Sequence, residues 1–185
     1  SDILEITIPS SVVYIGSLSF YECKNLSTIQ IPNSVTTIEN SAFSSCSNLV
    51  YIHIPSSVTY IGSHAFAYNN LFTIFVYSPI PVDLSNEVGV FEGVSKSNCH
   101  LWVPYNSTSA YQNASQWQDF INISEMLPDS INVTFRVDMQ NETVSENGVH
   151  LNGNFSDWNE PVAMSSSDGR IYTTTLRLKY GRTFE

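Results

Sequence analysis

The sequence predicts a mainly β protein with short helical turns, in which a solenoid of 23-residue repeats is followed by a truncated β-sandwich module. Two observations support this fold class. Residues 8–30, 31–53 and 54–76 repeat one pattern of apolar residues at a constant spacing. Beyond Pro128 the chain instead shows shorter alternating runs with glycine turns. A constant period of about 20 to 50 residues is typical of stacked repeat architectures.

Each of the three copies is too short to bury its own apolar face, so neighbouring copies must cover it and form one continuous core. The shared skeleton begins with Ile-Pro-x-Ser-Val, reaches an Ile and then a Phe, and ends in Leu and Ile. The alternation Ile-x-Ile predicts a strand, and a second short strand is expected around the Val. The Ser-Ala-Phe stretch predicts a helical turn with a Ser cap. Equivalent residues are Pro9, Pro32 and Pro55; Val12, Val35 and Val58; Ile15, Ile38 and Ile61; and Phe20, Phe43 and Phe66.

The repeat is irregular in three places. The third copy is one residue shorter, because Leu71 and Ile74 follow their counterparts by 22 residues. A further strand copy at 101–104 comes after what we interpret as an insertion at 78–98. Residues 3–9 match the end of a repeat, so we expect the array to begin before residue 1.

Residues 106–126 depart from the repeat and are predicted to cap the solenoid. Their aromatic residues have a roughly helical spacing, and Ser109 is the expected N-cap. The end of a solenoid exposes core that must be covered. We therefore expect Trp117 to pack into the core, with ligand binding as the less favoured alternative.

A boundary is predicted at 127–130, where Pro and small polar residues separate the two patterns. It divides the chain into a solenoid domain, 1–126, and a partial β-sandwich, 127–185. Short strands with turn spacing indicate antiparallel pairing in the second domain. Its alternating runs are 133–139, 149–155 and 171–178.

The repeat resembles the BspA-like class of leucine-rich repeats. The pattern of that class is Ile-Pro-x-Ser-Val-Thr-x-Ile-Gly-x-x-Ala-Phe-x-x-Cys-x-x-Leu, and residues 31–62 match it except that Glu39 stands where Gly is usual. The resemblance covers residues 3 to about 125. It implies an exported surface protein of gut or oral anaerobes, with host matrix proteins or partner cells as ligands.

The stretch 148–159 resembles early-set immunoglobulin-like modules related to glycogen-binding domains, because Gly153, Phe155 and Trp158 fit their Gly-x-Phe-x-x-Trp motif. The resemblance implies that Trp158 is either a platform for a sugar ring or a framework tryptophan. The other sugar contacts of these relatives fall beyond Glu185.

Composition and motifs exclude several functions. The net charge is −10 and no basic stripe occurs, which argues against nucleic-acid ligands and anionic membranes. Phosphate loops, nucleophile elbows and Cys-His catalytic patterns are absent, so we expect neither an enzyme nor a cofactor. The four histidines lack metal-ligand spacing, and no metal site is predicted. No apolar run is long enough to cross a membrane.

Cysteines at equivalent repeat positions leave two alternatives open. Cys23 and Cys46 are expected to stack in adjacent coils, at a distance that a disulfide can span. A buried free thiol fits the same position, and we favour it.

The outward positions of the predicted strands supply the candidate binding site. Large aromatic residues on an exposed sheet indicate a contact surface. The alternative is that 78–98 folds over Phe75 and Trp102 and makes them core. One row consists of Thr7, Gln30, His53, Phe75 and Trp102, and the next of Glu5, Thr28, Tyr51, Thr73 and His100. The candidate ligand-binding residues are Tyr51, His53, Phe75, His100 and Trp102.

The sequence thus favours a non-catalytic, cell-surface or secreted adhesion module that presents one sheet face to a protein ligand. An alternative is a polysaccharide-capture protein, in which the C-terminal module binds an α-glucan and the solenoid is a spacer. A third class, an accessory part of a surface hydrolase, depends on catalytic sequence beyond residue 185.

Overall fold

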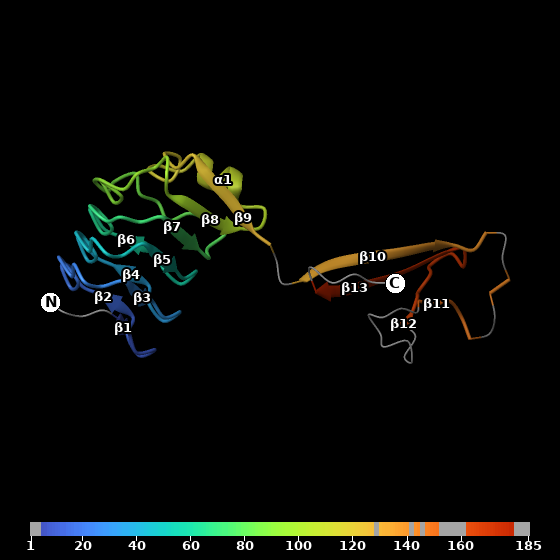
Figure 1. Cartoon of the computed structure of the whole chain (residues 1–185). Helices are drawn as coiled ribbons and strands as arrows, with labels where there is room; N and C mark the ends of the chain where they lie inside the picture. Colours follow the sequence, from blue (N-terminus) through green and yellow to red (C-terminus); the bar gives the residue numbers. More distant parts are fainter. Residues whose placement is uncertain (1–4, 128–129, 141–142, 145–146, 152–161, 180–185) are drawn as a thin grey trace. The chain divides into compact units, whose positions relative to one another are not determined.

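The structure is a computed structural model that describes residues 5–127, 130–140, 143–144, 147–151 and 162–179 (Figure 1). The chain divides into two compact units, Ser1–Met126 and Leu127–Glu185. Each unit is described by itself below.

The first unit is a solenoid whose coils contribute parallel strands to a common face (Figure 1). Two hydrogen-bonded sheets make up this face. One pairs β1 (Glu5–Thr7) with β3 (Thr28–Gln30), and the other contains β5 (Tyr51–Ile54), β7 (Thr73–Val76), β8 (His100–Pro104) and β9 (Asn122–Met126), in the order β5-β7-β8-β9. Equivalent repeat positions pair, as Ile6 with Ile29 and Ile52 with Ile74. Alternate residues are buried, because successive side chains of a strand point to opposite sides. The predicted solenoid is confirmed.

A second parallel sheet lies on another side of the coils. It contains β2 (Tyr14–Ile15), β4 (Thr37–Ile38) and β6 (Tyr60–Ile61), in the order β2-β4-β6. The inward Ile of each strand is at most 3% exposed. These are the second short strands that the sequence predicts.

The Ser-Ala-Phe segments form hydrogen-bonded turns, but no serine caps a helix there. Ser41 has a left-handed φ of 54°, which is unlike the extended conformation of an N-cap residue. The amide of Phe43 donates to Ala65 O of the next coil at 2.8 Å. Backbone groups are thus satisfied between coils, which leaves little role for a local helix.

The segment predicted as an insertion, 78–98, contains a fourth copy of this turn. Phe66 N donates to Val90 O at 3.0 Å, in the same manner as Phe43 N to the coil after it. The ring of Phe91 lies 5.8 Å from that of Phe66 and continues a column of stacked rings. The earlier members are Phe20, Phe43 and Phe66, with centroids 5.0 and 5.6 Å apart. The interpretation as a simple insertion is wrong, because the segment fills one coil of the core.

Residues 106–126 form a further coil, where the sequence predicts a helical cap. The helix α1 spans only Thr108–Gln112, and its N-cap residue is Ser107 instead of Ser109. The remainder includes β9, which pairs in parallel with β8 and extends the sheet. Trp117 is fully buried 5.0 Å from Phe91, and its indole N–H donates to Val82 O at 2.9 Å. Trp117 therefore has the core role expected of it.

The described part of the second unit contains two pairs of antiparallel strands. β10 (Ser130–Asp138) pairs with β13 (Ile171–Lys179), and β11 (His150–Leu151) pairs with β12 (Val162–Ala163). Antiparallel pairing agrees with the sequence, whereas the complete sandwich stays a prediction. Gly153, Phe155, Trp158 and residues 180–185 lie outside the described residues.

Candidate functional site

Parallel pairing places the candidate residues on one face of the solenoid sheet. In the register of β5, β7 and β8, His53 pairs with Phe75, and Phe75 with Trp102. Tyr51 and His100 both pair with Thr73, from opposite sides. The intervening Ile and Leu residues point into the core. All five candidate residues are thus outward-facing neighbours.

Four of these side chains form an aromatic ladder, which we define as His53, Phe75, Trp102 and His100. The His53 and Phe75 rings lie 4.5 Å apart with 9° between their planes. Phe75 and Trp102 are 6.4 Å apart at 13°, and Trp102 and His100 are 4.8 Å apart at 22°. Stacking of this kind adds about 0.5 to 1.5 kcal/mol per aromatic pair. The ladder is therefore held in place by contacts between its own rings.

The aromatic ladder is not covered by residues 78–98. Phe75 and Trp102 are only partly buried, whereas Leu84, Val90 and Phe91 are 0 to 1% exposed in the core. These three apolar side chains are thus used inside the coil, whereas Ile80 and Val88 of the same segment are exposed. The alternative in which it folds over the ladder is wrong.

Tyr77 belongs to this surface but is missing from the sequence-based candidates. Its hydroxyl lies 2.9 Å from His53 Nδ1, and the two rings are 5.9 Å apart at 14°. Tyr77 follows β7 at the repeat position that holds Pro55 in the preceding coil. The tyrosine at this repeated proline position is the sequence feature that could have identified Tyr77 as a candidate residue.

Burial and hydrogen bonding define the electrostatics of the ladder. Partial burial lowers the pKa of His53, because desolvation disfavours the charged imidazole. At the other end, His100 Nε2 lies 2.9 Å from Ser124 Oγ on β9. Ser124 was also missed, because the sequence assigned its segment to a cap. The ladder residues carry no acidic or primary-amine group. The ladder is therefore a mainly apolar surface whose polar atoms are the ring nitrogens of its histidines and tryptophan.

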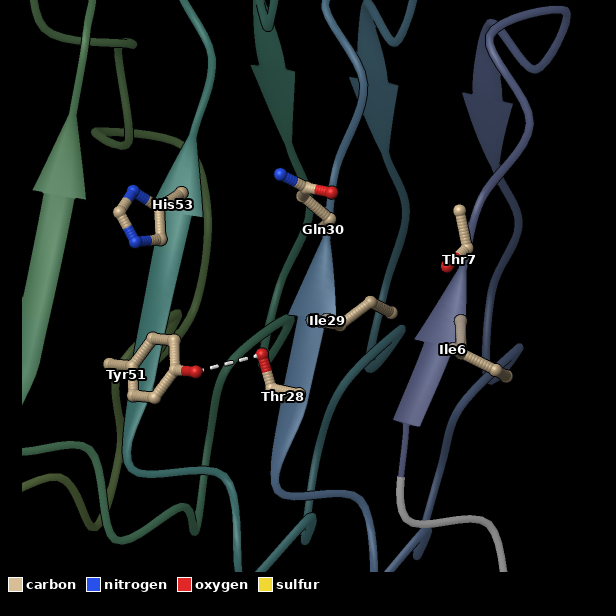
Figure 2. A pocket seen from close by; sticks show the side chains of 7 residues that line it. All are labelled: Ile6, Thr7, Thr28, Ile29, Gln30, Tyr51 and His53. Carbon is tan, nitrogen blue, oxygen red and sulfur yellow. Dashed lines mark hydrogen bonds between the residues drawn. The ribbon is translucent and has the colours of Figure 1, made fainter.

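Next to the ladder the side chains become smaller, and a trough lies over β1, β3 and β5 (Figure 2). Tyr51 leans toward β3, and its hydroxyl donates to Thr28 Oγ1 at 3.0 Å. One hollow of about 290 Å³ is lined by Thr7, Thr28, Gln30, Tyr51 and His53, with Ile6 and Ile29 beneath. A second of about 290 Å³ is lined by Gln30, Ile31, Asn33, His53, Pro55 and Tyr77. Because the two hollows share Gln30 and His53, we call them together the trough.

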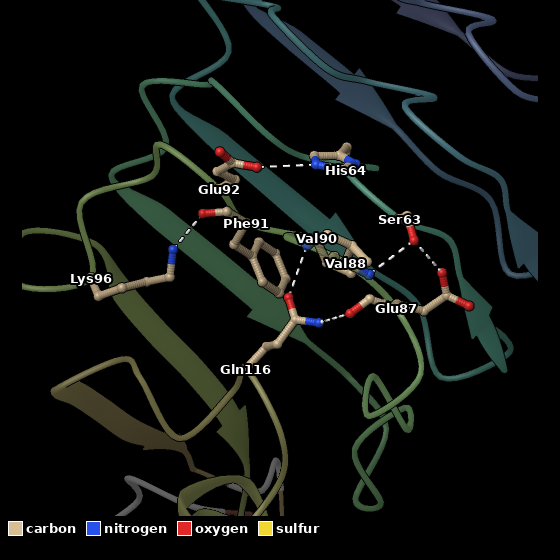
Figure 3. A network of polar contacts seen from close by, with 9 residues as sticks. All are labelled: Ser63, His64, Glu87, Val88, Val90, Phe91, Glu92, Lys96 and Gln116. Atoms are coloured by element: carbon tan, nitrogen blue, oxygen red, sulfur yellow. Dashed lines mark hydrogen bonds and ion pairs between the residues drawn. The ribbon is translucent and has the colours of Figure 1, made fainter.

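A separate polar network joins the third, fourth and fifth coils (Figure 3). Ser63 Oγ donates to Glu87 Oε2 at 2.7 Å and accepts from Val88 N at 2.9 Å. His64 Nε2 lies 3.0 Å from Glu92 Oε2. The serine and the histidine thus have different carboxylate partners. Their contacts connect coils and do not form a nucleophile–base pair.

Gln116 and Lys96 complete this network from the fifth and fourth coils. Gln116 Oε1 accepts from Val90 N at 2.8 Å, and its Nε2 donates to Glu87 O at 2.7 Å. Lys96 Nζ donates to the carbonyl oxygens of Phe91 and Val94. Desolvation lowers the pKa of Lys96. Both side chains satisfy backbone groups where the repeat is irregular.

Within the described ranges, no group of three His, Cys, Asp or Glu residues is arranged to hold a metal ion. Within the described residues, Cys23, Cys46 and Cys99 are not joined in disulfides. The Cys46 thiol donates to Phe20 O at 3.0 Å, and burial raises its pKa to about 11. Such a thiol is a structural group with little thiolate at neutral pH. The part of the chain that the structure covers has no helix long and apolar enough to span a membrane.

Comparison with known families agrees with the repeat geometry. A model of the BspA type leucine rich repeat region matches residues 1–102 in six copies. The chain belongs to the BspA-type leucine-rich repeat family. BspA-type repeats are scaffolds for binding, typically non-catalytic and found in surface or secreted proteins.

A solved structure similar to this BspA-type chain is a leucine-rich repeat protein from Bacteroides ovatus ATCC 8483. The two are 19% identical with a TM-score of 0.31, over 66% of this chain. The match covers 51% of the Bacteroides protein, so this chain spans about half of its length. No curated protein matches the chain.

Proposed function

We propose that the first unit is a non-catalytic, cell-surface or secreted adhesion module that presents the aromatic ladder to a protein ligand. The observation that carries this proposal is the row of stacked, partly exposed rings of His53, Phe75 and Trp102 on an open sheet. Aromatic residues are enriched at protein interfaces, and Trp and Tyr are frequent hot spots.

The rigidity of the ladder supports this function. Ordering a side chain on binding costs about 0.5 to 1.5 kcal/mol when it is free beforehand. Phe75 is already stacked between two neighbours, and His53 is also held by Tyr77. A ligand therefore meets a surface whose side chains have lost much of their freedom on folding.

The ligand class that we propose is a protein of the host matrix or of a partner cell surface, as the BspA-type family suggests. The ladder offers ring edges and faces and contains no carboxylate, ammonium or guanidinium group, so we expect contact with an apolar or aromatic patch. Binding of this kind depends weakly on salt, because no exposed ion pair contributes to it.

The test is binding of the full chain to purified extracellular-matrix proteins on a biosensor, with the double variant Phe75→Ala/Trp102→Ala. We expect the double variant to lose at least about tenfold in affinity, since two hot-spot side chains are removed. The matched control is Phe72→Ala, an exposed aromatic residue outside the ladder. Ligand binding that survives in the double variant would exclude the ladder as the binding face.

The alternative is polysaccharide capture by an immunoglobulin-like second unit. It depends on Trp158, which lies outside the described residues. The described strands β10 to β13 add no observation in its favour, and we retain the adhesion module as the proposed function.

A further inference from the structure

The trough has a different chemistry from the aromatic ladder beside it. The change occurs between β5 and β3, where His53 is followed along the row by Gln30 and Thr7 (Figure 2). Rings on one strand and short polar side chains on the next leave the two hollows of about 290 Å³ each. Small-molecule sites begin at about 300 Å³, so each hollow is at the lower end of that range and matches a small ligand or one unit of a polymer.

Two aromatic rings form a corner at the wall of the trough. The ring planes of Tyr51 and His53 meet at 86°, with their centroids 6.0 Å apart. The hydrogen bond from the Tyr51 hydroxyl on β5 to Thr28 on β3 holds the Tyr51 ring above the region between these two strands. A flat apolar group that enters the trough therefore contacts one ring by its face and the other by its edge.

Hydrogen-bonding groups in the trough are left without protein partners. The side-chain amides of Gln30 and Asn33 and the hydroxyl of Thr7 make no hydrogen bond within the described ranges. Each amide has donors and an acceptor. By contrast, the exposed amide of Asn70 is bonded to Ser47 O at 2.8 Å. The free amides are available to a ligand.

Apart from the imidazole of His53, whose pKa is lowered by burial, none of the residues that line the trough is acidic or basic. A phosphate, a carboxylate or an amine as ligand would find no opposite charge there, and its desolvation would be uncompensated. The groups present are rings, amides and hydroxyls. They match a ligand that combines apolar C–H faces with many hydroxyl groups and no charge.

We propose that the trough is a binding subsite for a neutral saccharide unit. A pyranose places its C–H face against the Tyr51 or His53 ring, and adjacent sugar hydroxyls bond to the Gln30 and Asn33 amides. This inference rests on the proposed function only in assuming that the same sheet face meets ligands. It does not involve the second unit or Trp158.

The test uses the full chain on an array of neutral oligosaccharides built from glucose, galactose, mannose and N-acetylglucosamine, with sialylated and sulfated glycans included. We expect retention on neutral glycans, followed by measurement of affinity by calorimetry. Gln30→Ala should weaken binding by about tenfold, as expected for loss of about 1.4 kcal/mol of hydrogen bonding. His53→Ala should weaken it by a similar factor through loss of the ring contact.

The matched control is Gln118→Ala, at an exposed position far along the chain from the trough. The Gln118 side chain makes no hydrogen bond in the described structure. It should leave glycan binding unchanged. Circular dichroism of each variant checks that the solenoid is folded.

Three results would overturn the saccharide subsite. They are binding to none of the neutral glycans, binding restricted to the charged glycans, and binding that is equal in wild type, Gln30→Ala and His53→Ala. The last result would place a glycan site elsewhere in the chain. If protein capture still fails in Phe75→Ala/Trp102→Ala while glycans do not bind, the adhesion proposal stands and only the subsite is rejected.

Discussion

One position of the repeat shows how different side chains perform the same structural task. Cys46 and Asn69 occupy equivalent places in successive coils. The Cys46 thiol donates to Phe20 O, and Asn69 Nδ2 donates to Phe43 O at 2.8 Å, in each case the phenylalanine of the preceding coil. Asn69 Nδ2 also donates to Phe66 O at 3.0 Å. The position therefore needs a small buried donor, which explains why a cysteine serves without forming a disulfide.

We predict that Asn69→Ala lowers the free energy of unfolding by about 1 to 3 kcal/mol, because buried carbonyl groups lose their donor. Asn69→Cys should cost less, since a thiol performs this task in the coil before, and the Asn69 Oδ1 atom it removes has no partner in the described structure. Urea unfolding followed by circular dichroism measures both changes. Asn70→Ala, at an exposed site, is the control, and equal losses in Asn69→Ala and Asn69→Cys would contradict the donor role.

The charge state of His53 is a second property of a single residue. Its pKa lies below the usual value of about 6.5, because partial burial disfavours the imidazolium form. The unfolded chain then binds the proton more readily than the folded chain. The contribution of His53 to stability is therefore complete above pH 6.5 and is lost as the pH falls through the folded pKa.

We predict that the His53 ring titrates below pH 6.5 in an NMR titration of the full chain, with the resonance assigned by its disappearance in His53→Ala. Ligand binding at the ladder should weaken over the same range, because protonation places a charge beside Phe75 and Tyr77. A midpoint at or above 6.5 would show that burial does not control this group.

At the scale of the elements, strand register was predictable and coil boundaries were not. The period of 23 residues aligns Ile52 with Ile29, and the shortened third copy correctly pairs Ile74 with Ile52. The fourth coil was not recognised in the sequence because Ile74 and Leu101 are 27 residues apart, and because Gly89-Val90-Phe91 replaces the Ala-Phe motif. Spacing alone cannot detect a copy when both its length and its key residues change. The conformation that Gly89 adopts, with φ 53°, is shared by His64 in the coil before and is visible only in the structure.

The candidate site, like the fold, was only partly predictable from the sequence. Alternation along the strands placed Phe75 and Trp102 on one outward row, which the structure confirms geometrically. The contact of Tyr77 with His53 and the free amide of Gln30 depend on side-chain geometry between coils, and no periodicity encodes these. Which ligand meets them stays a prediction.

Irregular coils need a side chain in place of a repeated backbone contact, and Gln116 is the clearest case. We predict that Gln116→Ala lowers the free energy of unfolding by about 1 to 3 kcal/mol, since Val90 N and Glu87 O lose their partner together. Hydrogen exchange at the Val90 amide should accelerate. Gln118→Ala is the control with the same chemical change at an exposed position, and an equally large effect there would refute the bridging role.

At the scale of the molecule, the column of phenylalanine rings connects the coils into one array. Each ring contacts only the coil before it and the coil after it, so stability is a sum of coil and interface contributions. Phe66 is fully buried between Phe43 and Phe91. Phe20 is partly exposed and stacks on Phe43.

The same substitution should therefore have different costs along the column. Phe66→Ala removes two ring contacts and leaves a cavity inside the array, and we predict a loss of about 3 to 5 kcal/mol. Phe20→Ala removes one ring contact at a site that solvent already reaches, so the loss should be less than half as large. Urea unfolding of the full chain, monitored by circular dichroism, gives both values. Equal losses would mean that the coils do not act through their nearest neighbours, because a ring with one partner would then contribute as much as a ring with two.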